Sequence, residues 1–283
     1  MTSSPAGPDY SAPGFVGCYR HPERMTGISC QRCHRPICGE CMQPASVGFQ
    51  CPRCVGRDRA TTRAPRTRYG AGLRNGAGGS ATKVVMALLA VVTLLDLPTG
   101  RLATGLLAMS NPGVGGGQLW RLVTTAFTSG GLLGLLMNLL VLWLVGRAIE
   151  AELGAWRFAA LYVLSALGGA TLFFLLGPAF GAALGASSAV VGLLAANAVG
   201  KLKNREDVRP DAGLFVLLVL YSVLVGFNSF GWLTLVGGIA AGALVGWVLA
   251  YAPRRNRGTV QVVGLLAIAV LCLVAVLARL LLG

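Results

Sequence analysis

The chain has 283 residues, of which 54% are hydrophobic and only 12% are charged, and its formal net charge is +14. Soluble domains have about 25% charged residues, so this composition excludes an ordinary soluble protein. The eight cysteines and two histidines are unevenly placed, because all except Cys272 come before residue 55. The remainder of the chain contains no histidine, which excludes histidine-dependent chemistry there.

Four regions follow one another along the chain. The first 14 residues are rich in Ser, Pro and Gly and predict a disordered tail without the features of a signal peptide. Residues 15–58 are polar and rich in cysteine, and residues 59–80 are basic and rich in glycine, which predicts a flexible linker. Residues 81–283 are predominantly apolar and predict a transmembrane domain.

Four ligand pairs occupy the polar region, and each pair has two intervening residues. They are Cys18 and His21, Cys30 and Cys33, Cys38 and Cys41, and Cys51 and Cys54. Eight such ligands are enough for two tetrahedral zinc ions, with no open position for catalysis. Disulfide bonds are the alternative, which a reducing cytoplasm disfavours. A block of about 40 residues buries little apolar area, so metal binding would supply most of its folding free energy.

The arrangement of these pairs resembles a B-box-type zinc finger. That resemblance implies a cross-braced fold, in which alternate pairs share one ion. One ion would be held by Cys18, His21, Cys38 and Cys41, and the other by Cys30, Cys33, Cys51 and Cys54. His34 is adjacent to Cys33 and is expected not to be a ligand. The expected role of the module is to bind a protein partner.

Seven apolar segments follow, and several approach the roughly 20 residues that cross a hydrocarbon core of about 30 Å. They lie at about 81–97, 130–149, 156–176, 187–200, 212–227, 230–251 and 259–280. Most of the 24 basic residues fall on one side of these segments, and only Arg101, Arg121 and Arg279 on the other. The positive-inside rule therefore predicts a cytoplasmic N-terminus and an external C-terminus. The expected location is a bacterial plasma membrane. Because topology explains the basic charge, nucleic-acid binding is not expected.

Three motifs stand in the apolar region. They are Trp120-Arg121 followed by an apolar stretch to Glu150, LGASSAVVGLLAANA over residues 184–198, and WLTLVGGIAAGALVGWVLAY over residues 232–251. In order and spacing they resemble the rhomboid family of intramembrane serine proteases, in particular actinobacterial members with an N-terminal zinc finger. The resemblance implies an all-α bundle that cuts transmembrane substrates within the bilayer.

The apolar segment 187–200 extends about 21 Å as a helix, which is less than the thickness of the bilayer core. We therefore expect this segment to begin inside the membrane, with Ser187 at its N-terminus and open to a water-filled cavity. Gly238, Gly242 and Gly246 form a stripe of small residues in the last motif, which predicts close approach to a neighbouring helix.

The rhomboid resemblance also implies roles for single residues. Ser187 takes the position of the nucleophile and Asn138 that of an oxyanion-stabilising residue. Leu235 takes the position of the catalytic histidine, Gly134 that of an oxyanion histidine, and Ser129 that of a loop histidine. A serine hydroxyl needs an adjacent base to become a good nucleophile, and leucine cannot accept a proton. Proteolysis is therefore predicted to be impaired.

No other side chain is expected to replace the missing base. Lys201 comes 14 residues after Ser187, which is about 21 Å along a helix, at the cytoplasmic end. Asp96 is expected to act as an interfacial cap near the outer end of the first segment. Ser188 stands where the family often has glycine, and its side chain is expected to crowd the cavity.

These features favour a rhomboid-like pseudoprotease that binds transmembrane segments of client proteins. Two alternatives stay open: an active intramembrane serine endopeptidase with Ser187 as nucleophile, and a cytoplasmic recruitment module on a membrane anchor. Two structural zinc ions are the expected cofactors. The expected partners are the lipid bilayer, transmembrane clients or substrates, and a cytoplasmic protein that binds the zinc module.

Overall fold

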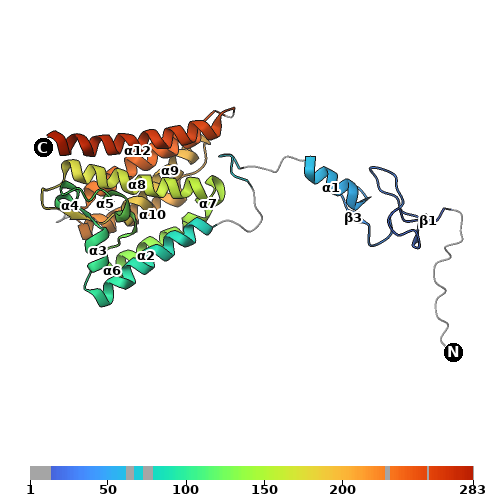
Figure 1. Cartoon of the computed structure of the whole chain (residues 1–283), viewed down its shortest axis with the longest axis horizontal. Helices are drawn as coiled ribbons and strands as arrows, with labels where there is room; N and C mark the ends of the chain where they lie inside the picture. Colours follow the sequence, from blue (N-terminus) through green and yellow to red (C-terminus); the bar gives the residue numbers. More distant parts are fainter. Residues whose placement is uncertain (1–13, 62–66, 73–78, 227–229, 254, 283) are drawn as a thin grey trace. The chain divides into compact units, whose positions relative to one another are not determined.

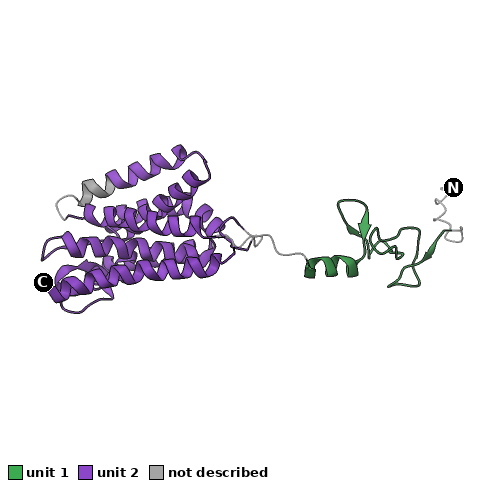
Figure 2. Cartoon of the chain, turned by 90° about the horizontal axis from the view of Figure 1, so that it is seen from above, with its two compact units in different colours: residues 1–65 green, residues 66–283 purple. Residues whose placement is uncertain are grey.

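The computed structural model describes residues 14–61, 67–72, 79–226, 230–253 and 255–282. The chain divides into two compact units, residues 1–65 and residues 66–283, which Figure 2 shows in different colours. Unit 1 contains the cysteine-rich region and unit 2 contains all the long helices (Figure 1).

Unit 1 consists of two small antiparallel hairpins and one helix. Its elements are β1 (Val16–Gly17), β2 (Met25–Thr26), β3 (Gln43–Pro44), β4 (Phe49–Gln50) and α1 (Pro52–Thr61). Strand β1 pairs with β2, and β3 pairs with β4. Apart from Ile37, the buried core of the unit is made of cysteines: Cys18, Cys30, Cys38, Cys41, Cys51 and Cys54. So little aliphatic burial cannot stabilise a fold of this size alone, which agrees with folding around metal.

Unit 2 is helical throughout, with one short strand pair, which confirms the predicted all-α membrane class. Its elements are α2 (Ser80–Thr99), α3 (Leu102–Leu107), β5 (Met109–Ser110), α4 (Asn111–Gly115), α5 (Arg121–Thr124), η1 (Thr125–Phe127), α6 (Gly131–Val141), η2 (Leu142–Gly146), α7 (Arg147–Leu153), α8 (Ala155–Leu176), β6 (Ala182–Ala183), α9 (Ala186–Lys203), α10 (Arg209–Gly226), α11 (Trp232–Tyr251) and α12 (Arg257–Leu282). All seven predicted apolar segments are helical.

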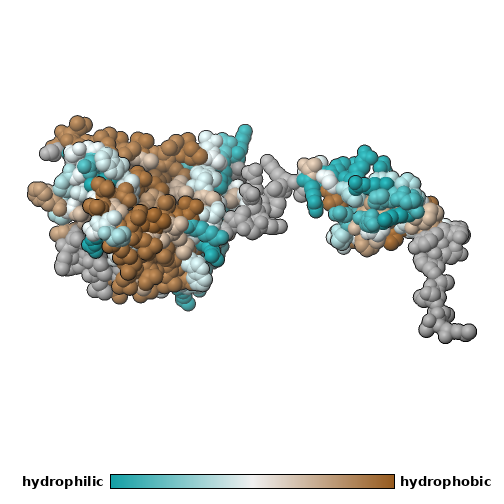
Figure 3. Space-filling model, turned by 60° about the horizontal axis from the view of Figure 1, so that its bottom comes forward, coloured by the Kyte–Doolittle hydropathy of each residue, from teal (hydrophilic) through white to brown (hydrophobic). Residues whose placement is uncertain are grey.

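Among the described residues, five helices are long and apolar enough to cross a membrane, where the sequence predicted seven spans. They are Ser80–Thr99, Gly131–Leu153, Ala155–Leu176, Trp232–Tyr251 and Arg257–Leu282. The other two predicted spans, α9 and α10, have charged ends: α9 carries Lys201 and Lys203 in its last turn, and α10 begins at Arg209 and Asp211. Figure 3 shows a broad apolar band on unit 2 between more hydrophilic ends, as expected of a protein surrounded by lipid.

Helix α11 packs tightly against α8 and α9, and its glycines make this possible. A Cβ atom on Gly242 would lie 2.3 Å from the carbonyl oxygen of Gly192 in α9, and one on Gly238 would lie 2.5 Å from that of Ser188. A Cβ on Gly246 would lie 2.7 Å from the Cα of Ala196. These positions confirm the predicted close approach, which aligns the starts of α9 and α11.

The predicted linker, residues 59–80, needs correction at both ends. Helix α1 continues to Thr61, and residues 67–72 belong to unit 2, where they contact the helical part of that unit. The Thr67 hydroxyl donates to the backbone oxygen of Glu152 at 2.7 Å, and Arg68 forms ion pairs with Glu152 and Glu206. Tyr69 is only 8% exposed. Composition alone suggested a solvated segment because these partners are distant in the sequence.

Candidate functional site

The loop before α9 is fixed by the chain segment between α2 and α6. Met109 and Ser110 of β5 pair with Ala183 and Ala182 of β6. The backbone N–H of Gly185 donates to Thr125 O at 3.1 Å. A Cβ on Gly185 would lie 2.8 Å from that same oxygen, so only glycine allows this approach. These contacts determine where α9 begins.

Ser187 is the second residue of α9, and its hydroxyl has one polar neighbour. The Asn138 Nδ2 atom, on α6, donates to Ser187 Oγ at 3.4 Å, and Asn138 is fully buried. Because the hydroxyl oxygen accepts this bond, its own hydrogen is left to donate to a further group. The structure thus brings together the two residues that the rhomboid resemblance places at the nucleophile and oxyanion positions.

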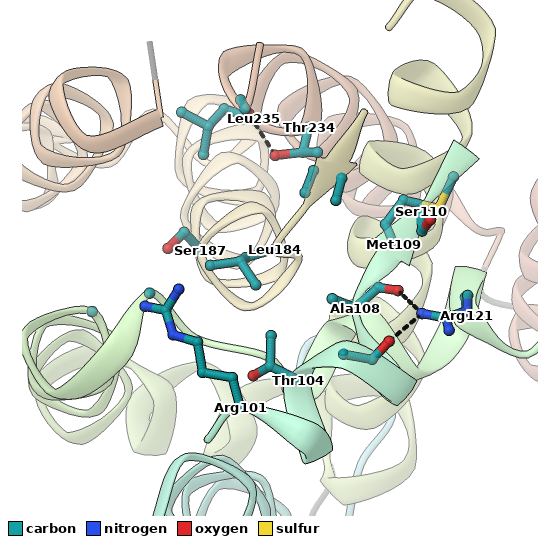
Figure 4. A pocket seen from close by; sticks show the side chains of 16 residues that line it. Arg101, Thr104, Ala108, Met109, Ser110, Arg121, Leu184, Ser187, Thr234 and Leu235 are labelled. Atoms are coloured by element: carbon teal, nitrogen blue, oxygen red, sulfur yellow. Dashed lines mark hydrogen bonds between the residues drawn. The ribbon is translucent and has the colours of Figure 1, made fainter. Parts of the chain in front are cut away.

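A cavity of about 440 Å³ opens beside Ser187 (Figure 4). Its walls come from α3, β5, β6 and the starts of α6, α9 and α11. The lining residues are Arg101, Thr104, Gly105, Ala108, Met109, Ser110, Arg121, Gly130, Gly134, Ala182, Ala183, Leu184, Ser187, Gly231, Thr234 and Leu235. This volume is within the usual range for binding pockets, roughly 300–1,000 Å³.

Two of the three positions of the missing histidines line this cavity. Leu235 and Gly134 are lining residues together with Ser187, and the three stand on separate helices. Leu235 is 3% exposed and offers the cavity an aliphatic wall. Ser129 is buried, and its hydroxyl has no hydrogen-bond partner among the described residues. Neither Leu235 nor Gly134 supplies a group that can take a proton from Ser187.

The expectation that Ser188 crowds the cavity is wrong. Its side chain is fully buried away from the cavity, where its hydroxyl donates to Gly185 O at 2.7 Å. Lys201 is paired with Asp211 at 2.6 Å, at the other end of α9 from Ser187. Asp96 accepts a hydrogen bond from the Thr104 backbone N–H at 2.9 Å and another from the Thr104 hydroxyl. Asp96 therefore stabilises α3, as a cap would, and Lys201 is not available as a base.

Two arginines in the cavity wall were not predicted as site residues. Arg121 is 9% exposed and donates to the backbone oxygens of Gly105 and Ala108 at 2.7 and 2.9 Å. Arg101 stands in the turn between α2 and α3 with a left-handed φ of 73°, and its side chain points into the cavity (Figure 4). In the sequence, Arg101 and Arg121 are two of the three basic residues assigned to the outer side of the membrane. The sequence analysis used them only to assign topology.

Unit 1 contains two clusters of ligand atoms. Those of Cys18, His21, Cys38 and Cys41 lie within 4.8 Å of one another, as do those of Cys30, Cys33, Cys51 and Cys54. This is the grouping that the B-box resemblance implied, and His34 belongs to neither cluster. All these cysteines are free thiols, which excludes the disulfide alternative for the described structure. Cys₃His and Cys₄ are donor sets typical of structural zinc.

The protonation of the cysteines agrees with metal binding. Burial raises the pKa of the Cys18 and Cys30 thiols, but backbone N–H donors outweigh this effect and bring each pKa to about 6. Burial, followed by neighbouring thiols, raises the pKa of Cys41 to about 11. The Cys51 thiol, followed by burial, raises the pKa of Cys54 to about 12. The cysteine thiols of one cluster therefore lose all their protons together only when a cation balances their charge, as happens when a metal ion binds.

The apolar helical bundle, with a serine at a helix N-terminus beside a cavity between helices, is that of a multi-pass membrane protein. Residues 116–252, just under half of the chain, match the rhomboid domain, which supports a protein of the rhomboid family. The match covers Trp120, Asn138, Ser187 and Leu235.

Three relatives illustrate the similarity. RHOMBOID-like protein 5 of Arabidopsis thaliana is 34% identical over 148 residues, which are 49% of this chain and 46% of the relative. Rhomboid protease GluP of Bacillus subtilis is 31% identical over 170 residues, 58% of this chain and 33% of the relative. Rhomboid protease GlpG of Salmonella paratyphi A is 30% identical over 140 residues, 49% of this chain and 50% of the relative. The chain thus spans half or less of the length of these relatives.

Proposed function

We propose that this protein is a rhomboid pseudoprotease that binds transmembrane segments of client proteins without cutting them at an appreciable rate. One observation carries the proposal. Among the described residues that line the cavity, the only side chains that ionise are Arg101 and Arg121. A guanidinium stays protonated in proteins and cannot act as a general base, so Ser187 has no group to activate it.

The retained parts of the site support binding rather than simple loss of function. The close packing of α9 on α11 persists, and the cavity beside Ser187 is open and mostly apolar. An apolar wall made by Met109, Leu184 and Leu235 suits an unwound or small-residue stretch of a transmembrane helix. Packing and exclusion of lipid, rather than chemistry, would then hold the client.

An active serine endopeptidase is the second candidate, and the contact between Asn138 and Ser187 favours it. That contact keeps an amide N–H next to the serine, where an oxyanion would form. On this view Ser187 reacts slowly, or a bound partner supplies the missing base.

A fluorophosphonate probe separates the two candidates. We expect purified protein in detergent to show no labelling above that of Ser187→Ala, because the hydroxyl has no base. The double variant Leu235→His with Gly134→His should gain labelling of Ser187 by roughly 10²–10⁴-fold, the usual contribution of a general base. Labelling of the unmodified protein that Ser187→Ala abolishes would overturn the pseudoprotease proposal and establish the endopeptidase.

For unit 1 we propose a B-box-like module with two structural zinc ions, on the cytoplasmic side of a bacterial plasma membrane. The two Cys/His clusters support the metal, and the basic residues of the N-terminal region support the topology. The module would recruit a cytoplasmic protein to the membrane unit. We propose residues 15–58, extended by the end of α1, as its bounds. Alkylation of Cys54 and Cys272 in intact cells, after zinc removal, tests the topology.

A further inference from the structure

The cavity beside Ser187 carries positive charge that nothing in it balances. Arg101 and Arg121 line it, and no carboxylate is found among the described residues of its wall. Arg121 donates to three neutral acceptors, the backbone oxygens of Gly105 and Ala108 and the side-chain oxygen of Gln118. Neutral acceptors satisfy the N–H groups of a guanidinium and leave its charge in place.

Arg101 has a different surrounding from Arg121. No hydrogen bond or ion pair holds its guanidinium within the described structure, and the backbone turn at φ 73° directs the side chain into the cavity (Figure 4). Its backbone N–H donates to Asp96 O, which fixes the turn itself. The result is a positioned residue with a free charged end.

The acidic residues of unit 2 explain why Arg101 has no partner. Five of them, Glu150, Glu152, Glu206, Asp207 and Asp211, lie toward the ends of α7 and α9 or in the start of α10, at the end of the bundle opposite to Ser187. Asp96 is the only acid near the cavity, and both its carboxylate oxygens accept from Thr104. Asp96 keeps its charge, because Thr104 is a neutral donor, but within the described structure its carboxylate makes no ion pair with Arg101.

We propose that the cavity selects transmembrane segments that carry an Asp or Glu side chain, with Arg101 as the counter-ion and the Ser187 hydroxyl as a second donor. This inference rests on the proposed client-binding function and names the class of client. Arg101 is exposed, so its guanidinium is accessible to an incoming segment, and a guanidinium matches a carboxylate in a two-point hydrogen bond. Ser187 can donate because its oxygen already accepts from Asn138.

The remaining wall suits the rest of such a segment. Met109, Leu184 and Leu235 present apolar surface around the two polar groups, so an acidic side chain would lie among otherwise apolar contacts. Leu235 has a function in this arrangement, because a histidine there would add a third polar group at the carboxylate. The residue that removes proteolysis thus keeps the site selective for one acid.

The test uses the full-length protein in phosphatidylcholine nanodiscs and two synthetic single-span peptides. The peptides have an apolar stretch of roughly 20 Leu and Ala residues and differ only in Asp or Asn in the outer third of the span. Binding is measured by fluorescence energy transfer at about pH 8, because burial raises the pKa of a carboxyl group. We expect the Asp peptide to bind roughly tenfold tighter than the Asn peptide, as for a hydrogen-bonded charge pair.

Two arginine variants locate the effect. Arg101→Gln should abolish the preference for Asp, so that the two peptides bind with equal affinity. Arg279→Gln is the matched control, since Arg279 is also on the side with few basic residues but donates to Leu175 O away from the cavity. It should keep the full preference. Ser187→Ala should reduce the preference several-fold without abolishing it.

The outcomes separate this inference from the proposed function. If neither peptide binds, the client-binding function is refuted and the inference with it. If both peptides bind equally, or if Arg101→Gln keeps the preference, the inference is wrong and client binding stands. In nanodiscs that contain phosphatidylglycerol, the lipid phosphate can compete with the Asp peptide for Arg101. If this competition removes the preference for Asp, the site binds a lipid phosphate, and the proposal of a client carboxylate is overturned.

Discussion

Replacing Gly242 by alanine should strongly destabilise the membrane unit. The added Cβ would lie 2.3 Å from the Gly192 carbonyl oxygen and 2.5 Å from the Gly192 Cα. Both are backbone atoms of α9, so no side-chain rotation can relieve the clash. Ordinary contact distances begin near 3.4 Å, so α9 and α11 must separate by about 1 Å.

The cost of that separation can be worked out from packing. A gap of 0.5–1 Å forfeits about a quarter to a half of the dispersion energy of each contact pair, and this interface extends from Ser188 to Ala196 on α9. Overpacking in cores costs about 1–3 kcal/mol, occasionally more. Because the clash is between backbones, we expect Gly242→Ala to lower the free energy of unfolding by about 3 kcal/mol.

Reversible unfolding in mixed micelles, followed by tryptophan fluorescence, measures this change. Gly213→Ala in α10 is the matched control, since a Cβ there meets nothing within 4 Å. It should stabilise by about 0.5–1 kcal/mol, the usual gain of alanine over glycine in a helix. A loss of less than about 0.5 kcal/mol for Gly242→Ala would refute the close backbone contact between α9 and α11.

Four further predictions concern other parts of the chain. Cys30→Ser should lower the zinc content, measured by metal analysis, from two ions to about one per chain. His34→Ala should keep both ions, because Cys30 belongs to a ligand cluster and His34 does not. Tyr69→Ala should destabilise the unit by about 3 kcal/mol, because Tyr69 is 8% exposed. Arg68→Ala should cost about 1 kcal/mol or less, because its ion pairs are partly exposed. Glu150→Ala should cost about 3 kcal/mol or more by the same unfolding measurement, because this buried carboxylate accepts four hydrogen bonds at the start of α2.

Much of the fold was predictable because it depends on patterns that are local in the sequence. Long apolar runs must form helices in a bilayer, since every backbone group needs a partner within the segment, and all seven runs are helical. The spacing of the cysteine pairs indicated eight candidate ligands, and the B-box resemblance implied a grouping that the clusters match. The stripe from Gly238 to Gly246 predicted close approach to a neighbouring helix, which in the structure is α9.

The parts that were missed depend on contacts between distant residues. Arg68 reaches Glu152 and Glu206, which are 84 and 138 positions away, so composition alone made residues 67–72 look like free linker. The buried direction of Ser188 depends on Gly185 and on the exact start of α9. Arg101 enters the cavity through a left-handed turn that no pattern of hydrophobic residues encodes.

Two features of the cavity have the same chemical effect. The cavity lacks a histidine, and the charged side chains among its described lining residues are arginines, so neither feature offers Ser187 a proton acceptor. A Ser–His site needs an acceptor beside the hydroxyl, so that the serine gives up its proton. Here the described lining residues offer the hydroxyl two arginines, neutral hydroxyls and apolar carbon but no base, and its hydrogen is left to donate because its oxygen accepts from Asn138. A site of donors without a base favours an anion and leaves it intact. The geometry of the cavity therefore suits the proposed capture of an acidic segment, and Leu235→His would add the base that Ser187 lacks.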